Sequence, residues 1–227
     1  MLLTLPLRAP TEVRAGVLRW RGPPRHRGKL VPRARVRFRR HVRIAGQLRS
    51  RAGSPLADAD VQILERSSVS PEHLLATIRT DQHGRWIYLT RANTTSIVRV
   101  LHPGTSTTLP SQREVKILVP ASSTIRVLPR RLLNGQAVTF RGTLRARPIP
   151  AVGKLVELQV VLSGRWQTFQ TVRSDARGSW AVRYRFRRSC GLTRYRFRAR
   201  LPAEAGYPFE AGKTRPIVVQ VRGRPCG

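Results

Sequence analysis

The stretch TIRTDQHGRW at residues 77–86 returns as TVRSDARGSW at residues 171–180, an offset of 94 positions. A second pair of blocks, VRIAGQLRSR at 42–51 and VTFRGTLRAR at 138–147, repeats in the same order at an offset of 96. Two blocks that recur in order at nearly one offset indicate a duplicated module of about 95 residues. That is an ordinary size for a β-sandwich domain.

Each of the first two stretches contains a predicted tight turn. Asp81 and Asp175 begin these turns, and Gly84 and Gly178 follow three residues later. An Asp at the first turn position accepts hydrogen bonds from nearby backbone N–H groups, and Gly adopts the left-handed conformation that other residues resist. One carboxylate per turn falls far short of the roughly six to eight oxygen ligands of a calcium site. All four residues are therefore predicted to be structural.

Short runs of alternating apolar and polar residues, bounded by turns, predict strands along most of the chain. Capped helical periodicity is absent, and 17 Pro and 17 Gly interrupt most candidate helices. The expected fold class is all-β: two tandem immunoglobulin-like (transthyretin-like) β-sandwich modules with a basic N-terminal segment. The expected domains are residues 1–29, 30–120 and 121–227. The expected strands are 34–39, 41–48, 59–65, 73–80, 85–90, 95–101 and 113–119 in the first module, and 124–128, 137–145, 154–162, 166–173, 179–187, 193–200 and 216–222 in the second.

The charge is strongly basic, because 44 Lys and Arg residues face 11 Asp and Glu residues, for a net charge of +33. Only four of the basic residues are lysine. Many arginines alternate with apolar residues, as in RARVRFR at 33–39, RYRFR at 183–187 and RYRFRAR at 194–200. Period-two alternation places apolar side chains on one face of a strand and guanidinium groups on the other. Either these faces are merely solvated, or they bind anions, and in both cases we expect nonspecific adhesion to polyanions at low salt.

The first module resembles the carboxypeptidase regulatory-like modules, which share a transthyretin-like, immunoglobulin-like β-sandwich. The resemblance rests on Gly46-Gln47-Leu48, on GSPLADADVQI at 53–63 and on TDQHGRW at 80–86. The second module keeps Gly142-Thr143-Leu144, VELQ at 156–159 and DARGSW at 175–180, but it has PIPAV at 148–152 in place of the Pro-Leu-x-x-Ala element. It is more similar to the bacterial immunoglobulin-like repeats of secreted actinobacterial proteins. These resemblances imply a spacer, an adhesive unit or a sugar-binding accessory module.

The N-terminal segment, residues 1–29, lacks the charged n-region and the uninterrupted apolar core of a signal peptide. Within it, TEVRAGVLRWR at 11–21 alternates like the last strand of a module. Two interpretations stay open: the remnant of a preceding module, or a disordered basic arm around residues 22–28. No stretch approaches the roughly 18 consecutive apolar residues of a membrane span.

Catalytic, metal and cofactor motifs are absent from the sequence. There is no Gly-x-Ser-x-Gly, Gly-x-Gly-x-x-Gly, phosphate-binding loop, His-Glu-x-x-His or Cys-x-x-Cys. The five histidines show no ligand spacing, and Asp58 and Asp60 have no equivalent in the second module. We therefore expect no catalytic residue, no metal and no cofactor.

Three functions remain as hypotheses. The first is a noncatalytic spacer or adhesion-type module of an exported or cell-surface bacterial protein, which contacts other modules of the same chain and a cell-envelope polyanion or glycan. The second is a carbohydrate-binding accessory module, with Trp166 and Tyr207 as exposed aromatics and Arg185 and Arg196 as further ligand contacts. The third is nucleic-acid binding, expected to be nonspecific because the aromatic and cationic residues of these strands alternate onto opposite faces.

The two cysteines, Cys190 and Cys226, are predicted to form a disulfide. If 193–200 and 216–222 pair as antiparallel strands with Arg200 opposite Pro216, the numbers of paired positions sum to 416. The two cysteine numbers also sum to 416, which would place them opposite each other just beyond the ladder. Such a bond would indicate an exported protein, because cytosolic thiols stay reduced.

Overall fold

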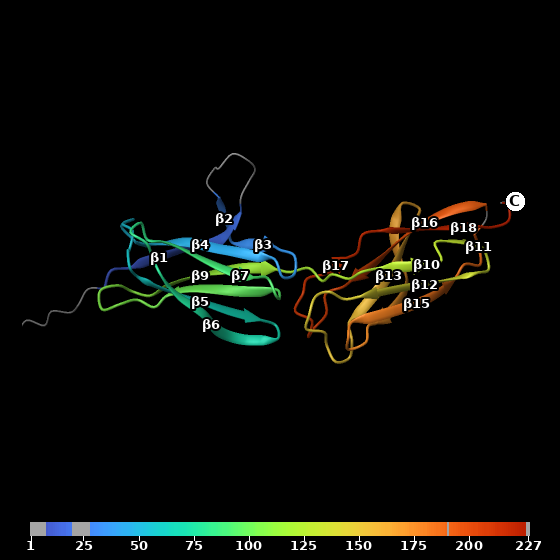
Figure 1. Cartoon of the computed structure of the whole chain (residues 1–227). Coiled ribbons are helices and arrows are strands. Elements are labelled where there is room, and N and C mark those ends of the chain that lie inside the picture. The colour runs from blue at the N-terminus through green and yellow to red at the C-terminus, as the bar shows by residue number, and fades with distance from the viewer. Residues whose placement is uncertain (1–7, 20–27, 190, 226–227) are drawn as a thin grey trace, which may run out of the picture. The chain divides into compact units, whose positions relative to one another are not determined.

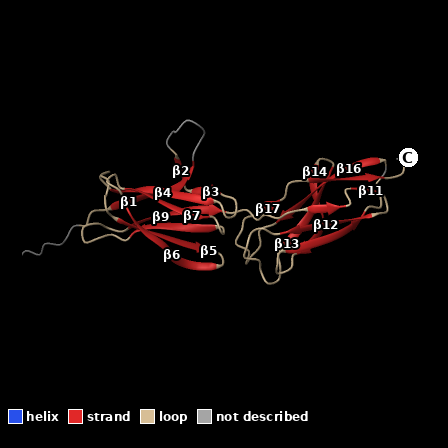
Figure 2. Ribbon diagram, viewed as in Figure 1, coloured by secondary structure: helices blue, strands red, loops and turns tan. Residues whose placement is uncertain are grey.

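The computed structural model describes residues 8–19, 28–189 and 191–225. Within these residues every regular element is a strand, and the chain is all-β (Figure 2). The chain divides into two compact units, Met1–Val119 and Pro120–Gly227, here called unit 1 and unit 2 (Figure 1).

Unit 1 is a sandwich of two sheets. One sheet has the strand order β2-β1-β4-β7, and the other has the order β3-β9-β8-β5-β6. The strands are β1 (Thr11–Arg19), β2 (Lys29–Val31), β3 (Arg33–Arg35), β4 (His41–Ser50), β5 (Asp60–Ser67), β6 (Ser70–Arg79), β7 (Arg85–Arg91), β8 (Ser96–His102) and β9 (Ser111–Leu118).

Unit 2 is a second sandwich of the same design. Its smaller sheet has the order β10-β12-β15, and its larger sheet has the order β11-β18-β16-β13-β14, with β17 paired to β16. The strands are β10 (Arg126–Leu128), β11 (Arg131–Leu133), β12 (Ala137–Thr143), β13 (Leu155–Leu162), β14 (Arg165–Arg173), β15 (Ser179–Arg185), β16 (Leu192–Leu201), β17 (Gly212–Lys213) and β18 (Ile217–Arg222).

Eight strands of each unit correspond, whereas β2 and β17 have no counterpart in the other unit. Strands β1, β4 and β7 correspond to β10, β12 and β15, and β3, β9, β8, β5 and β6 correspond to β11, β18, β16, β13 and β14. In both units a short strand crosses to the second sheet and pairs in parallel there, β3 with β9 and β11 with β18. The other strand pairs are antiparallel. This arrangement is the tandem immunoglobulin-like sandwich that the sequence repeat predicted.

One boundary expectation was wrong. Strand β1 pairs with β4 over seven positions, from Thr11 opposite Ser50 to Val17 opposite Ile44. Val13 and Val17 are buried in the core of unit 1. Residues 11–19 are therefore the first strand of unit 1, the counterpart of β10, and not a remnant of another module. The basic arm predicted around residues 22–28 lies, except for residue 28, outside the described residues.

The cores of the two units differ in chemistry. Unit 1 buries mainly Val, Ile and Leu side chains. Unit 2 adds an aromatic cluster in which Phe140 lies 4.9 Å from Phe197 and Phe186 lies 5.3 Å from Tyr195, measured between ring centroids. The aromatic residues of RYRFR and RYRFRAR thus point inward, as their alternation with arginine predicted.

The repeated turns have closely similar hydrogen bonds. Asp81 Oδ1 accepts hydrogen bonds from the backbone N–H groups of His83 (2.8 Å) and Arg85 (2.7 Å). The hydrogen bond from Arg85 lowers the pKa of the Asp81 carboxyl. Gly84 has φ +67° and its counterpart Gly178 has φ +81°, the left-handed region that favours glycine.

The register of the last strand pair differs from the expectation. Phe197 lies opposite Ile217 and Tyr195 opposite Val219, so the paired numbers sum to 414. Arg200 pairs with Lys213 of β17 instead of with residue 216. The predicted register was therefore wrong by two residues, and so was the alignment of position numbers on which the disulfide prediction rested. Cys190 and Cys226 lie outside the described residues, and their disulfide stays a prediction.

Candidate interaction surface

The arginines of unit 2 lie on the outer faces of both sheets. Arg183 and Arg185 are exposed on β15, whereas Val182, the residue before Arg183, is buried. On β16, Arg194 and Arg196 are exposed and Phe197 is buried. The predicted ligand contacts Arg185 and Arg196 therefore lie on opposite sheets of the sandwich, and the fold does not bring them into one site.

Four arginines share the outer face of the smaller sheet. Arg126 of β10 lies directly opposite Arg141 of β12. Arg141 lies opposite Ala181 of β15, so the two side chains point to the same face. Arg183 and Arg185 follow Ala181 at intervals of two residues and therefore point to that face as well. All four side chains are exposed, and no hydrogen bond or ion pair joins their guanidinium groups to another described residue. We call these four residues the arginine cluster.

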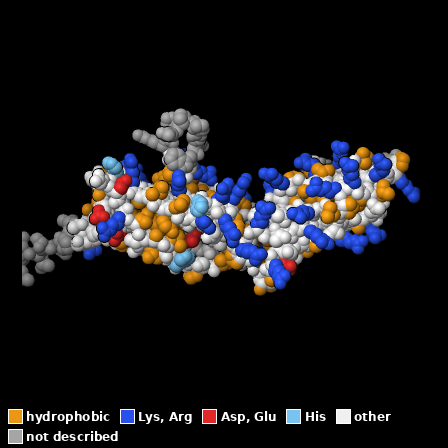
Figure 3. All heavy atoms as spheres, in the orientation of Figure 1, with side chains coloured by type: hydrophobic (Ala, Val, Ile, Leu, Met, Phe, Trp, Pro, Cys, Tyr) orange, Lys and Arg blue, Asp and Glu red, His pale blue; other side chains and the backbone are white. Residues whose placement is uncertain are grey.

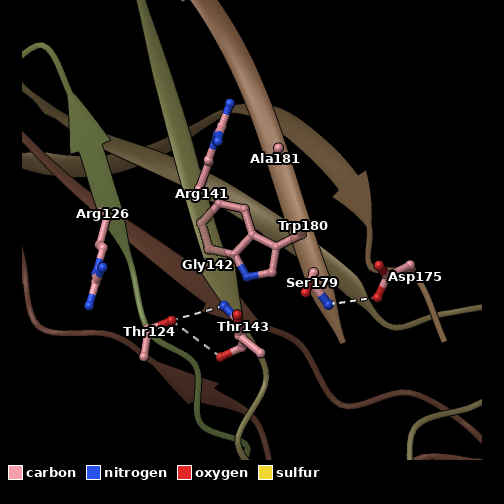
Figure 4. A pocket seen from close by; sticks show the side chains of 9 residues that line it. All are labelled: Thr124, Arg126, Arg141, Gly142, Thr143, Asp175, Ser179, Trp180 and Ala181. Atoms are coloured by element: carbon pink, nitrogen blue, oxygen red, sulfur yellow. Dashed lines mark hydrogen bonds between the residues drawn. The ribbon is translucent and has the colours of Figure 1, made fainter. Parts of the chain in front are cut away.

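The arginine cluster borders an open depression of about 790 Å³ (Figure 4). Trp180 is one of the residues that line it, and its indole lies across Gly142 on the neighbouring strand. A Cβ atom at position 142 would lie 2.3 Å from Trp180 Cζ2, so only glycine leaves room for the ring. The lining residues are Thr124, Arg126, Arg141, Gly142, Thr143, Asp175, Ser179, Trp180 and Ala181.

One end of the depression is polar and partly acidic. Figure 4 shows Asp175 and Ser179 on one side of the Trp180 ring and Arg126 on the other. The backbone N–H of Ser179 donates to Asp175 Oδ1 at 2.7 Å, and the backbone N–H of Thr143 donates to Thr124 Oγ1 at 2.9 Å. Thr143 lies opposite Ser179. The side-chain hydroxyls of these two residues, and the second carboxylate oxygen of Asp175, have no partner within the described part of the chain.

The depression is a feature that the sequence did not predict. Trp180 is buried, with its Nε1–H donating to Ser123 Oγ at 3.0 Å. The arginines that flank it are 15 positions apart in sequence, and only the register of β10 against β12 places them side by side.

The outer face of the larger sheet carries a different arrangement. The Arg198 guanidinium lies over the Trp166 ring, 4.0 Å from its centroid, and its Nε donates to Gln159 Oε1 at 2.8 Å. Arg200 forms an ion pair of 2.7 Å with Glu157. Burial, followed by the charge of Arg200, lowers the pKa of Arg198. These two arginines are thus engaged within the protein, in contrast to the arginine cluster.

The aromatic residues expected to contact sugar are not displayed as predicted. Tyr207 is buried, with its ring 4.7 Å from that of Phe209 and its hydroxyl donating to the carbonyl of Ala146 at 3.1 Å. Burial raises the pKa of Tyr207 to about 12. Trp166 is half-buried, and Arg198 covers one face of its ring. The prediction for Tyr207 was wrong, because its loop folds onto the core.

The same outer face in unit 1 carries fewer arginines at the corresponding positions, because only Arg91, at the position of Arg185, matches a member of the arginine cluster. By strand register, Gly16, Ala45 and Leu89 occupy the positions of Arg126, Arg141 and Arg183. Ile87 and Leu89 are more than half exposed there. Figure 3 shows hydrophobic side chains gathered on the visible face of unit 1, and Lys and Arg side chains spread over the visible face of unit 2.

Other titratable groups in the described residues have structural partners or stand apart. His102 is buried between the carbonyl of Asp60, 2.9 Å from its Nδ1, and Thr108 Oγ1, 3.1 Å from its Nε2. Asp58 contacts Arg79 at 3.1 Å. The described residues contain no group of three or more His, Cys, Asp or Glu side chains arranged to hold a metal ion. They also include no helix with the length and apolar character to cross a membrane.

Comparison of the sequence with family models and with curated proteins found no match. The structure is similar to the Yersinia pseudotuberculosis adhesin InvE, with a TM-score of 0.35 and 14% identity, over 82% of this chain and 56% of that one. A tetra-tandem repeat from the extending region of a large adhesion protein is similar at a TM-score of 0.43 and 12% identity, over 94% of this chain and 48% of that one. The chain thus spans about half the length of these two structures. At these scores the likenesses carry no conclusion about function.

Proposed function

We propose that this chain is a noncatalytic interaction module of an exported or cell-surface bacterial protein, and that unit 2 binds polyanions. One observation carries the proposal: the four exposed arginines of the arginine cluster have no acidic partner among the described residues. Residues 120–227 contain 22 basic and 4 acidic residues, a net charge of +18. Two of these acids, Glu157 and Glu204, already bind basic groups. Unpaired guanidinium groups on a rigid sheet are suited to binding oxyanions by bidentate hydrogen bonds.

Unit 1 offers an internal contrast. On the outer face of its larger sheet, Arg66 pairs with Glu114 at 2.9 Å and Arg99 pairs with Glu72. These arginines are neutralised by neighbours on the same face. The larger sheet of unit 2 pairs Arg200 with Glu157 in the same way. The arginine cluster on the smaller sheet, which has no such acidic partner among the described residues, is therefore what supports unit 2 as the binding unit.

The carbohydrate hypothesis loses its original basis. It relied on exposed rings at Trp166 and Tyr207, and the second of these is buried while the first stacks under Arg198. Electrostatic recognition by arginine therefore has more support than recognition through an aromatic platform.

A Cys190–Cys226 disulfide would support the exported location, since cytosolic proteins keep their thiols reduced. Peptide mapping of nonreduced protein from an oxidising compartment tests it. A crosslinked pair of peptides supports export, and two free thiols would remove this support.

The polyanion proposal is tested on the full chain by measuring its affinity for polygalacturonate, heparin and duplex DNA at two salt concentrations. We expect binding that weakens steeply as salt rises, because bound counterions are released on association. Absence of binding to all three polymers at low salt would contradict the proposal.

A further inference from the structure

We infer that the arginine cluster and the depression beside it form a binding site for an acidic polysaccharide. This inference rests on the proposed polyanion binding of unit 2 and adds to it a location and a ligand class. The polysaccharide would then bind to the outer face of the smaller sheet, and not to the whole basic surface of unit 2.

The first argument is the direct opposition of Arg126 and Arg141. Cross-strand neighbours have Cβ atoms about 5 Å apart, and like charges directly opposite each other destabilise a sheet. No acidic side chain of the described residues pairs with either guanidinium group. An anionic ligand that bridges both groups removes this repulsion, so the pair is arranged for an oxyanion and not for the stability of the free protein.

The second argument is the internal comparison between the repeats. Unit 1 builds the same sheet with Gly16, Ala45 and Leu89 at the positions of the three leading arginines. The sandwich therefore does not need arginine at these positions. Unit 1 has an equivalent depression, in which Gly46, Asp81 and Trp86 match Gly142, Asp175 and Trp180. The arginines beside the depression therefore distinguish the two units, and the depression itself does not.

The third argument concerns the ligand class. Asp175 lies at the polar end of the depression with one carboxylate oxygen free of partners in the described chain, beside the hydroxyls of Thr143 and Ser179. A carboxylate accepts hydrogen bonds and repels anions, so its ligand must be a donor. A sugar hydroxyl is such a donor, whereas the phosphodiester backbone of a nucleic acid offers acceptors. An acidic sugar supplies both groups, hydroxyls for Asp175 and carboxylates for the arginines.

The spacing of the face fits a linear chain. Residues two apart on a strand point to the same face and lie about 7 Å apart. Moving along the strands from the polar end, the face presents Thr143 with Ser179, then Arg126 with Arg141, then Arg183, then Arg185. A polymer lying along the strands meets hydroxyl groups first and cationic groups at each later step.

The test compares two variants of the full chain that each lose two charges. Arg126→Gln/Arg141→Gln removes the opposed pair and keeps the side-chain stems. Arg194→Gln/Arg196→Gln removes two exposed arginines from the other sheet. We expect the first variant to lose about tenfold in polygalacturonate affinity per guanidinium group, about a hundredfold in all, because charge-assisted bonds are lost. The control should lose about threefold or less, because distant charges are screened by salt.

Two further variants sharpen the result. Arg126→Lys/Arg141→Lys keeps the charge and loses the bidentate geometry. We therefore expect its affinity for polygalacturonate to lie between that of the wild type and that of the Gln variant. Asp175→Asn should weaken binding of polygalacturonate and strengthen binding of duplex DNA, since only the sugar uses the carboxylate as an acceptor. Circular dichroism and the thermal midpoint report whether each variant is folded.

The outcomes distinguish failure of the proposed binding site from failure of the proposed polyanion binding. Equal losses in the two Gln variants would overturn the site and leave the polyanion function in place. Failure of the wild type to bind polygalacturonate, heparin or DNA would overturn both. DNA binding that is tighter than polygalacturonate binding, and equally dependent on Arg126 and Arg141, would overturn the saccharide class.

Discussion

Lys154 Nζ lies 2.7 Å from Glu204 Oε2, and the lysine side chain is completely buried. The same carboxylate accepts a hydrogen bond from the backbone N–H of Leu155 at 3.1 Å, and its other oxygen lies 2.7 Å from Arg173. Glu204 follows β16, whereas Lys154 immediately precedes β13. The ion pair thus fastens the loop after β16 to the start of a central strand of unit 2.

Replacing Glu204 with Gln leaves the buried ammonium group of Lys154 without a counter-charge. Breaking a buried pair from one side costs about 3–5 kcal/mol, because the remaining charge is neither solvated nor paired. We expect Glu204→Gln to unfold at a clearly lower urea concentration than the wild type, followed by tryptophan fluorescence. Glu210→Gln, whose side chain has no such partner in the described chain, is the control. Equal midpoints for the two variants would contradict the role of the pair.

The same pair makes unit 2 sensitive to acid. Burial by itself raises the pKa of Glu204, but hydrogen bonds from Lys154, Leu155 and Arg173 outweigh it and lower the pKa to about 2, from 4.5. A carboxyl with a lowered folded-state pKa stabilises the protein above its unfolded pKa, and this stability is lost as the pH falls toward the folded value. The thermal midpoints of wild type and Glu204→Gln should therefore converge between pH 4.5 and 2. A constant gap over this range would contradict the assignment.

Gly84 and Gly135 distinguish two destabilising effects of adding a side chain, namely backbone strain at positive φ and steric overlap with a neighbouring atom. Both have positive φ, +67° and +91°, but a Cβ atom at Gly84 would lie 2.4 Å from the carbonyl oxygen of Leu48. At Gly135 nothing lies within 4 Å of that position. We expect Gly135→Ala to lose about 1 kcal/mol from backbone strain alone. Gly84→Ala should lose more free energy of unfolding, because its new Cβ atom also meets the Leu48 carbonyl oxygen. Equal losses for the two variants in urea unfolding would contradict this steric cost at the repeated turn.

Tyr207 is expected to act in stability and not in binding. Tyr207→Phe removes the hydrogen bond to Ala146 and should cost about 1 kcal/mol. In a spectrophotometric titration of the wild type, one tyrosine should ionise near pH 12, and this step should vanish in the variant. Affinity for polygalacturonate should not change. A weaker affinity in a folded variant would return Tyr207 to the binding surface.

The sequence predicted those features that depend on local pattern. The repeat predicted two sandwiches, and alternation predicted that Phe186 and Phe197 would face the core while neighbouring arginines face outward. Asp81 and Gly84 identified a tight turn because their chemistry is specific to it.

Features that depend on pairing across strands could not be read from the sequence. Strand β1 is separated from β4 by residues 20–40, so nothing local showed that it belongs to unit 1. The opposition of Arg126 and Arg141 requires a register, and a register error of two residues already misplaced the partners of β16. The contact of Lys154 with Glu204 joins residues 50 positions apart, and neither position carries a motif.

Protection of individual arginines from chemical modification measures most directly where the polymer binds. The full chain is treated with phenylglyoxal, which reacts with guanidinium groups, in the presence and absence of polygalacturonate, and each arginine is quantified by peptide mass spectrometry. We expect strong protection of Arg126, Arg141 and Arg183, and little change at Arg43 and Arg91 on the corresponding face of unit 1. Uniform protection of all arginines, or protection confined to unit 1, would contradict a binding site on the smaller sheet of unit 2.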